Sequence, residues 1–163
     1  MHTKWDNLRQ NIEVIVKELN IPREDFQPLG IYDDWEQIEQ KIYDKFCDVN
    51  YPNNKPVWLW EHFKLKTTSL PLEARFNLLE KLVEPKEDVW FFVNGDKDKF
   101  WFYHGNIGAI LKVILESSYI DELYLASKKY EWLICINHHD VLVATGEPMA
   151  ERLLNLSNEV SML

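Results

Sequence analysis

Residues 89–103, which read VWFFVNGDKDKFWFY, decide the fold class of this chain. Two runs of β-branched and aromatic residues, 89–93 and 100–103, flank a cluster of turn-forming residues at 94–99. This arrangement is typical of a β-hairpin. Because large side chains occupy both faces of both runs, we expect the two strands to lie centrally in a sheet that is covered on both sides.

The sequence on both sides of the hairpin predicts further helices and strands. Apolar residues recur at helical spacing directly after the hairpin, and runs of β-forming residues follow. Helices are expected at about residues 3–19, 34–49, 69–83, 107–116 and 148–160, and later strands at 122–126, 131–137 and 141–144. Residues 22–30 are interpreted as a connector. Residues 57–63 are assigned to a strand, with a helix as the alternative.

Together these elements predict an α+β fold with an antiparallel sheet of about five strands. The order is the hairpin, a helix and then a three-stranded meander, with N-terminal, middle and C-terminal helices packed against the sheet. No linker-like stretch divides the chain, and its length suits one hydrophobic core. We therefore expect a single α+β domain over residues 1–163.

The composition excludes several functional classes. Hydrophobic residues make up 46% of the 163 residues, which is too many for an intrinsically disordered chain. With 18 basic and 27 acidic side chains, the net charge of −9 argues against binding to nucleic acid or to an anionic membrane surface. Residues 1–50 (6 basic, 11 acidic) and 101–163 (4 basic, 8 acidic) carry this charge, and residues 51–100 are neutral.

The cysteines and the hydropathy pattern bear on the cellular compartment. No window of sequence approaches the roughly 20 apolar residues of a membrane span, and the N-terminus has no apolar signal core. Cys47 and Cys135 lie far apart in apolar contexts, so we interpret them as reduced and buried thiols. The sequence therefore favours a cytoplasmic protein.

The most conspicuous polar cluster is the predicted turn at residues 137–140, Asn-His-His-Asp. Asn137 and Asp140 are expected to cap this turn through their side chains. The two imidazoles diverge on such a turn, and no ligand spacing typical of zinc is present, so we predict no metal centre. The candidate binding residues are Asn137, His138, His139, Asp140 and, beyond the hairpin, His104.

No residue is assigned a catalytic role on the basis of the sequence. It contains no nucleophile-elbow motif and no Gly-rich phosphate loop, and neither cysteine has a basic residue and a histidine beside it. We therefore expect no cofactor.

Residues 122–140, ELYLASKKYEWLICINHHD, followed by Gly146, resemble the C-terminal part of a family of small uncharacterised bacterial proteins, a domain of unknown function. The aromatic hairpin fits the same pattern, so that the resemblance covers about residues 85–146 and implies no activity. More loosely, small acidic α+β proteins of this size are similar to immunity proteins that neutralise toxins, including the SUKH-type group. That second likeness rests on size, charge and fold class alone.

These observations favour a non-enzymatic binding module, of the toxin-immunity type, that offers an acidic surface to a basic protein partner. Neither nucleic acid nor a membrane is expected as a partner. Two alternatives stay open. The first is an enzyme that uses His138, His139 and Asp140 as metal ligands or as acid–base groups. The second is an oligomeric structural protein that buries exposed aromatic side chains between copies.

Overall fold

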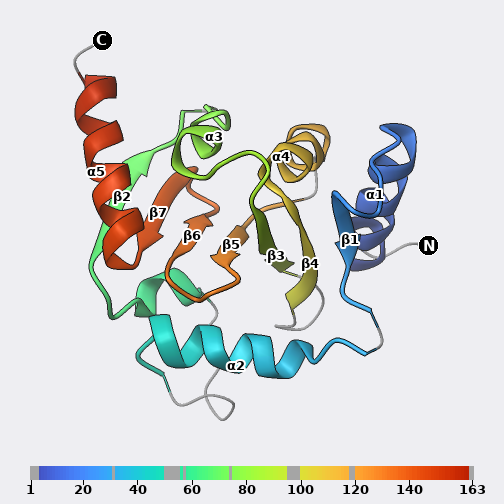
Figure 1. The fold of residues 1–163 in the computed structure, drawn as a ribbon, viewed down its shortest axis with the longest axis horizontal. Helices are drawn as coiled ribbons and strands as arrows, with labels where there is room; N and C mark the ends of the chain where they lie inside the picture. Colours follow the sequence, from blue (N-terminus) through green and yellow to red (C-terminus); the bar gives the residue numbers. More distant parts are fainter. Residues whose placement is uncertain are drawn as a thin grey trace.

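The computed structural model describes residues 4–30, 32–49, 56, 58–73, 75–94, 100–117 and 120–161. These residues form an α+β fold around one antiparallel sheet of seven strands (Figure 1). The strands are β1 (Phe26–Pro28), β2 (Thr67–Pro71), β3 (Asp88–Asn94), β4 (Phe100–Asn106), β5 (Leu123–Ser127), β6 (Leu133–Ile136) and β7 (Val141–Thr145). The helices are α1 (Lys4–Glu18), α2 (Trp35–Phe46), α3 (Leu78–Leu82), α4 (Ile107–Glu116) and α5 (Glu147–Ser161), with a 3-10 helix η1 (Leu59–His62).

The predicted hairpin is formed by β3 and β4 and lies inside the sheet. The strand order is β1-β4-β3-β5-β6-β7-β2, so β3 has β4 on one side and β5 on the other. Phe91 and Phe92 are both buried, and they belong to two different hydrophobic cores. Because neighbouring residues of a strand point to opposite faces, the two cores lie on opposite faces of β3, as the sequence predicts.

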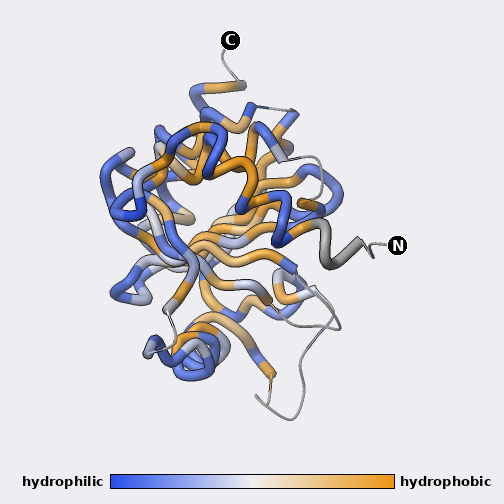
Figure 2. Tube along the Cα trace, turned by 90° about the vertical axis from the view of Figure 1, so that its right-hand side faces the viewer, coloured by the Kyte–Doolittle hydropathy of each residue, from blue (hydrophilic) through white to orange (hydrophobic). Residues whose placement is uncertain are grey.

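Helices cover the two faces of the sheet unequally. Helix α2 lies along one face, and α1, α3, α4 and α5 lie on the other (Figure 1). The core on the α2 side includes Ile42 and Phe46 of α2 and Leu59 of η1. In Figure 2 hydrophobic segments run through the middle of the molecule, and hydrophilic segments follow its outer turns. The sheet therefore separates two cores, and residues at its ends reach the surface.

The prediction of about five strands is wrong, because the structure has seven within the described residues. The two missed strands, β1 and β2, precede the hairpin in sequence and form the two edges of the sheet. Strand β1 has three residues, too few to show an alternating pattern, inside the segment interpreted as a connector. Strand β2 ends at Pro71, where the missing N–H removes no central ladder bond, and the helix expected over residues 69–83 is confined to α3, Leu78–Leu82.

The segment at residues 57–63 is also corrected by the structure. Leu59–His62 forms the 3-10 helix η1 and not a strand, and Val57 lies outside the described residues. Leu59 is buried in the α2-side core, and the next residue after η1, Phe63, forms a single β-bridge with Cys47. Burial of Leu59 thus fixes this short turn, where the sequence pattern indicated extended backbone.

Both cysteines are buried and unpaired, as the sequence predicts. Burial raises the pKa of the Cys47 thiol to about 12 and also raises the pKa of Cys135. Both groups therefore stay protonated near neutral pH, where a reactive cysteine would form a thiolate. The cysteines act as small apolar core residues.

Replacement of Gly146 by alanine is expected to destabilise the fold. This glycine joins β7 to α5 with a φ of +100°, and a Cβ atom there would lie 2.5 Å from the carbonyl oxygen of Glu131. We expect Gly146→Ala to lower the free energy of unfolding by about 1–3 kcal/mol, measured by urea denaturation. The control is Gly30→Ala, where the nearest atom is 3.4 Å away; its effect should stay within about 0.5 kcal/mol. Equal stability of the two variants would contradict the prediction.

Candidate functional site

The turn between β6 and β7 is held by Asn137. Its buried side-chain oxygen accepts hydrogen bonds from the backbone N–H groups of His139 (2.9 Å) and Val141 (3.2 Å). Asp140 has a left-handed φ of +58°, and its N–H donates to the carbonyl oxygen of Asn137 at 3.0 Å. Asn137 therefore caps the turn through its side chain, as predicted, whereas Asp140 closes it through the backbone. The turn presents His138 and His139 at one end of the sheet.

The side chain of Glu122 connects three separate segments at this end of the sheet. Its carboxylate oxygen Oε2 accepts a hydrogen bond from the indole Nε1 of Trp60 on η1 at 3.0 Å. The same oxygen lies 2.6 Å from Nδ1 of His138 and accepts from the His138 backbone N–H at 3.3 Å. Glu122 is only 2% exposed. A carboxylate this deeply buried requires such partners, because an unpaired charge in the interior is costly.

A fourth contact to Glu122 comes from Tyr124. The hydroxyl of Tyr124 lies 3.4 Å from Oε1 of Glu122. Burial, together with the neighbouring Cys135 and Glu122, raises the pKa of Tyr124, so that its hydroxyl keeps its proton and serves as a donor. Both oxygens of the carboxylate thus face donors from the protein.

The contact with Glu122 determines the chemistry of the His138 ring. Oε2 of Glu122 already accepts hydrogen bonds from the Trp60 indole and from the His138 backbone N–H, so we assign the ring hydrogen of His138 to Nδ1, which faces the same oxygen. In this tautomer the lone pair is on Nε2, which can accept a hydrogen bond from a ligand. The His138 side chain is 30% exposed, so a ligand in solution can reach it. His138 is therefore oriented from inside the protein and accessible from outside.

Aromatic rings surround His138. The Trp58 ring centroid is 5.0 Å away and that of His139 is 3.9 Å away, while Trp60 lies 6.3 Å from His138 and 6.4 Å from His139. Trp58 is 40% exposed, although large aromatic side chains are usually buried. We call the group Trp58, Trp60, His138 and His139 the Trp–His surface. Its rings can stack on a partner, attract a cation or exchange hydrogen bonds.

His104 does not belong to this group. It is paired with Trp90 across the hairpin, and its Nδ1 lies 3.4 Å from Nζ of Lys128 and 3.6 Å from Oδ2 of Asp88. Lys128 also pairs with Asp88 and lies 4.6 Å from the Trp90 ring centroid. Glu122 and Lys128 flank β5 at opposite ends, roughly 20 Å apart along an extended chain. The five candidate residues are therefore divided between two clusters.

The sequence did not identify Glu122, Trp58 or Trp60 as site residues. One signal was available for Glu122, because alternation along the predicted strand 122–126 places its side chain on the same face as the apolar Tyr124 and Ala126. A carboxylate on a buried face needs partners. Their identity depends on contacts across 62 residues for Trp60 and 16 residues for His138, which no local pattern indicates.

Among the residues that the structure describes, no group of three or more His, Cys, Asp or Glu side chains is placed to hold a metal ion. His138 and His139 form a pair of close rings, which is fewer ligands than a zinc site requires. In the same part of the chain, no helix combines the length and the apolar character needed to cross a membrane.

The fold and the site define an α+β protein whose seven-stranded antiparallel sheet carries a buried glutamate paired with an accessible histidine beside the exposed ring of Trp58. By comparison with family models, the chain belongs to a family of unknown function, DUF6756, whose model matches residues 4–157. Membership of a family of unknown function was predicted from residues 85–146, and the match extends over nearly the whole chain. No curated protein matches the chain.

Substitution of the buried carboxylate is expected to weaken the fold at this site. Glu122→Gln removes the charge and leaves one accepting oxygen, which cannot serve both Trp60 and His138 on one side and the Tyr124 hydroxyl on the other. We expect the free energy of unfolding to fall by about 1–3 kcal/mol, measured by urea denaturation. Glu61→Gln, on the exposed side of η1, should change it by less than about 0.5 kcal/mol. A Glu122→Gln protein as stable as the wild type would show that the carboxylate is not needed to hold the three segments together.

Proposed function

We propose that this chain is a non-enzymatic binding module that presents an acidic surface to a basic partner protein, with the Trp–His surface at the centre of the contact. The observation that supports this most directly is the exposed Trp58 beside a histidine fixed by a buried carboxylate. Tryptophan is among the residues that contribute most to binding energy in protein interfaces. An exposed tryptophan therefore suits the centre of a contact.

The Trp–His surface is also well prepared to bind. The buried carboxylate of Glu122 contacts both the Trp60 indole N–H and Nδ1 of His138, so these two side chains are already ordered before a partner binds. Side chains that need not be immobilised on binding lose less entropy. The hydrogen bond from Asn137 to His139 restrains the turn in the same way.

Charge favours a basic partner. The chain has a net charge of −9, and the exposed acidic residues Glu61 and Asp140 lie next to the Trp–His surface in sequence. A lysine or arginine of the partner could contact the face of Trp58 and pair with these carboxylates. Complementary charge of this kind also accelerates association.

The partner in this proposal is a toxin, and the chain is its immunity protein. The support for this finer step is the size, the acidity and the α+β class of the chain, which it shares with SUKH-type immunity proteins. A basic protein captured by this chain should inhibit growth when it is expressed alone, and co-expression of the chain should restore growth. A captured partner that is harmless would contradict the immunity function and leave the binding function in place.

The binding surface is tested by capture of partners from the native host with wild-type and variant protein. Trp58→Ala should weaken the captured complex by about 2 kcal/mol or more, measured by calorimetry with the purified partner. Tyr32→Ala is the matched control, because this tyrosine is 96% exposed and lies before α2, far from η1 in the sequence. Asp140→Asn combined with Glu61→Gln should slow association and reduce its dependence on salt. Equal binding by the Trp58 and Tyr32 variants would rule out the Trp–His surface.

A second candidate function, acid–base catalysis by His138, is favoured by its 2.6 Å contact with Glu122. A carboxylate that orients an imidazole is a recurring arrangement in enzymes. Within the described residues, no hydrogen bond joins His138 to a hydroxyl or thiol side chain, so the nucleophile would be water or a substrate group. Hydrolysis of chromogenic esters or phosphates by the wild type, lost in His138→Gln, would establish this function in place of pure binding.

A further inference from the structure

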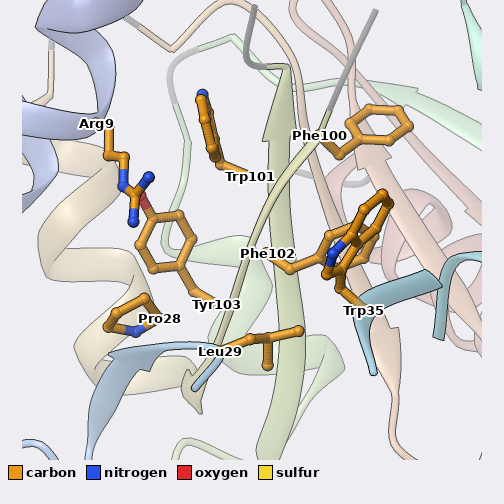
Figure 3. Close-up of a pocket in the computed structure, with 8 residues that line it drawn as sticks. All are labelled: Arg9, Pro28, Leu29, Trp35, Phe100, Trp101, Phe102 and Tyr103. Atoms are coloured by element: carbon orange, nitrogen blue, oxygen red, sulfur yellow. The ribbon is translucent and has the colours of Figure 1, made fainter. Parts of the chain in front are cut away.

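A cavity of about 160 Å³ lies at the edge of the sheet where β1 ends. Strand β1 pairs with β4 only as far as Pro28 opposite Tyr103, and the Leu29 N–H then donates to the carbonyl oxygen of Phe102 at 3.2 Å. Beyond this point β4 continues to Phe100, and the described β1 residues no longer run beside it. The cavity occupies this position, and its lining comes from α1, β1, α2 and β4 (Figure 3).

The walls of the cavity are largely aromatic. Phe100 and Phe102 come from the α2 side of β4, and Trp101 from the opposite side. Trp35, the first residue of α2, closes the cavity next to Phe102 (Figure 3). In other proteins an apolar cavity of about 150 Å³ binds benzene. The size and the walls therefore suit one flat aromatic ring.

Besides the two tryptophans, two polar side chains line this cavity, Tyr103 and Arg9. The Tyr103 hydroxyl is buried and has no hydrogen-bond partner in the described part of the chain, and the residue is only 3% exposed. Arg9 lies 4.9 Å from the Trp101 ring centroid, and its positive charge acts on the Tyr103 hydroxyl more strongly than the negative charge of the nearby Glu13. Figure 3 shows the Arg9 guanidinium beside the hydroxyl end of the Tyr103 ring.

The state of these two groups favours an anion. Burial raises the pKa of Tyr103 to about 12, so its hydroxyl remains protonated at neutral pH and can donate. Arg9 has a long contact of 4.0 Å with Glu13, and both side chains are more than half exposed, so this pair holds the guanidinium weakly. A guanidinium beside an unused hydroxyl donor matches the two oxygens of a carboxylate.

We propose that this cavity is a binding site for a small aromatic carboxylate with a single ring. The ring lies across the open edge of β4, against Trp101 on one side of the strand and Trp35 on the other, and the carboxylate accepts hydrogen bonds from the Arg9 guanidinium and the Tyr103 hydroxyl beneath it. The site is independent of the Trp–His surface. It lies on the β1 edge of the sheet, whereas the turn that carries His138 joins β6 to β7 near the other edge.

The test is a calorimetric titration of the full chain with benzoate and phenylacetate. We expect one saturable site for at least one of these carboxylates. Benzyl alcohol, which lacks the charge, and acetate, which lacks the ring, should bind about tenfold more weakly or not at all. Absence of saturable binding by both aromatic carboxylates would overturn the proposal, and so would equal binding of benzyl alcohol.

Variants assign the binding to this cavity. Arg9→Gln should weaken binding about tenfold and Tyr103→Phe several-fold, whereas Arg23→Gln, at an exposed arginine outside the cavity, should leave it unchanged. The Tyr103→Phe protein should melt at the same temperature as the wild type or slightly above it, because the hydroxyl has no hydrogen-bond partner among the described residues. Unchanged affinity in both cavity variants would place the ligand elsewhere and overturn the proposal.

Discussion

The buried carboxylate of Glu122 is the constraint on which one whole end of the molecule depends. A carboxyl group in the interior must be matched by hydrogen-bond partners, and those partners come from η1 and from the β6–β7 turn. Because one oxygen is shared by Trp60 and His138, neither segment can shift without leaving charge unpaired. The neighbouring Trp58 is held beside the His138 ring as a consequence. The need to pair the buried carboxylate of Glu122 thus sets the geometry of the Trp–His surface.

The two cores explain why polar chemistry gathers at the ends of the strands. All five residues of β5 are buried, so the strand can carry charge only where it enters and leaves the sheet. Glu122 lies directly before β5 and Lys128 directly after it. Each of these two side chains contacts a histidine. Glu122 pairs with His138, and Lys128 lies beside His104. The same burial that stabilises the sheet therefore divides its histidines between two opposite ends.

The sequence predicted those elements whose own pattern is strong. The structure contains the aromatic hairpin, the helix over Ile107–Glu116 and the three later strands. These elements can be predicted locally, because each is an apolar run bounded by clear turn residues. The edge strands were missed for the opposite reason. Strand β1 is too short to show a period, and Ser69-Leu70-Pro71 resembles a helix start although pairing with β7 makes it a strand. For the site, local polarity identified His138 and His139, whereas the carboxylate that orients His138 depends on long-range contacts.

The edges of the sheet lead to a last argument about how the two proposed sites can coexist. A sheet edge is open to pairing unless it is covered or interrupted, and here β1 and β2 both end in proline. Strand β2 runs beside all of β7, but β1 covers only three residues of β4 and leaves room for the aromatic cavity. Between that cavity and the β6–β7 turn lie β3 and β5, and no residue that lines the cavity belongs to the Trp–His surface. Distant sites that share no partner usually act independently. A ligand at the β1 edge and a protein at the Trp–His surface should therefore bind independently of each other.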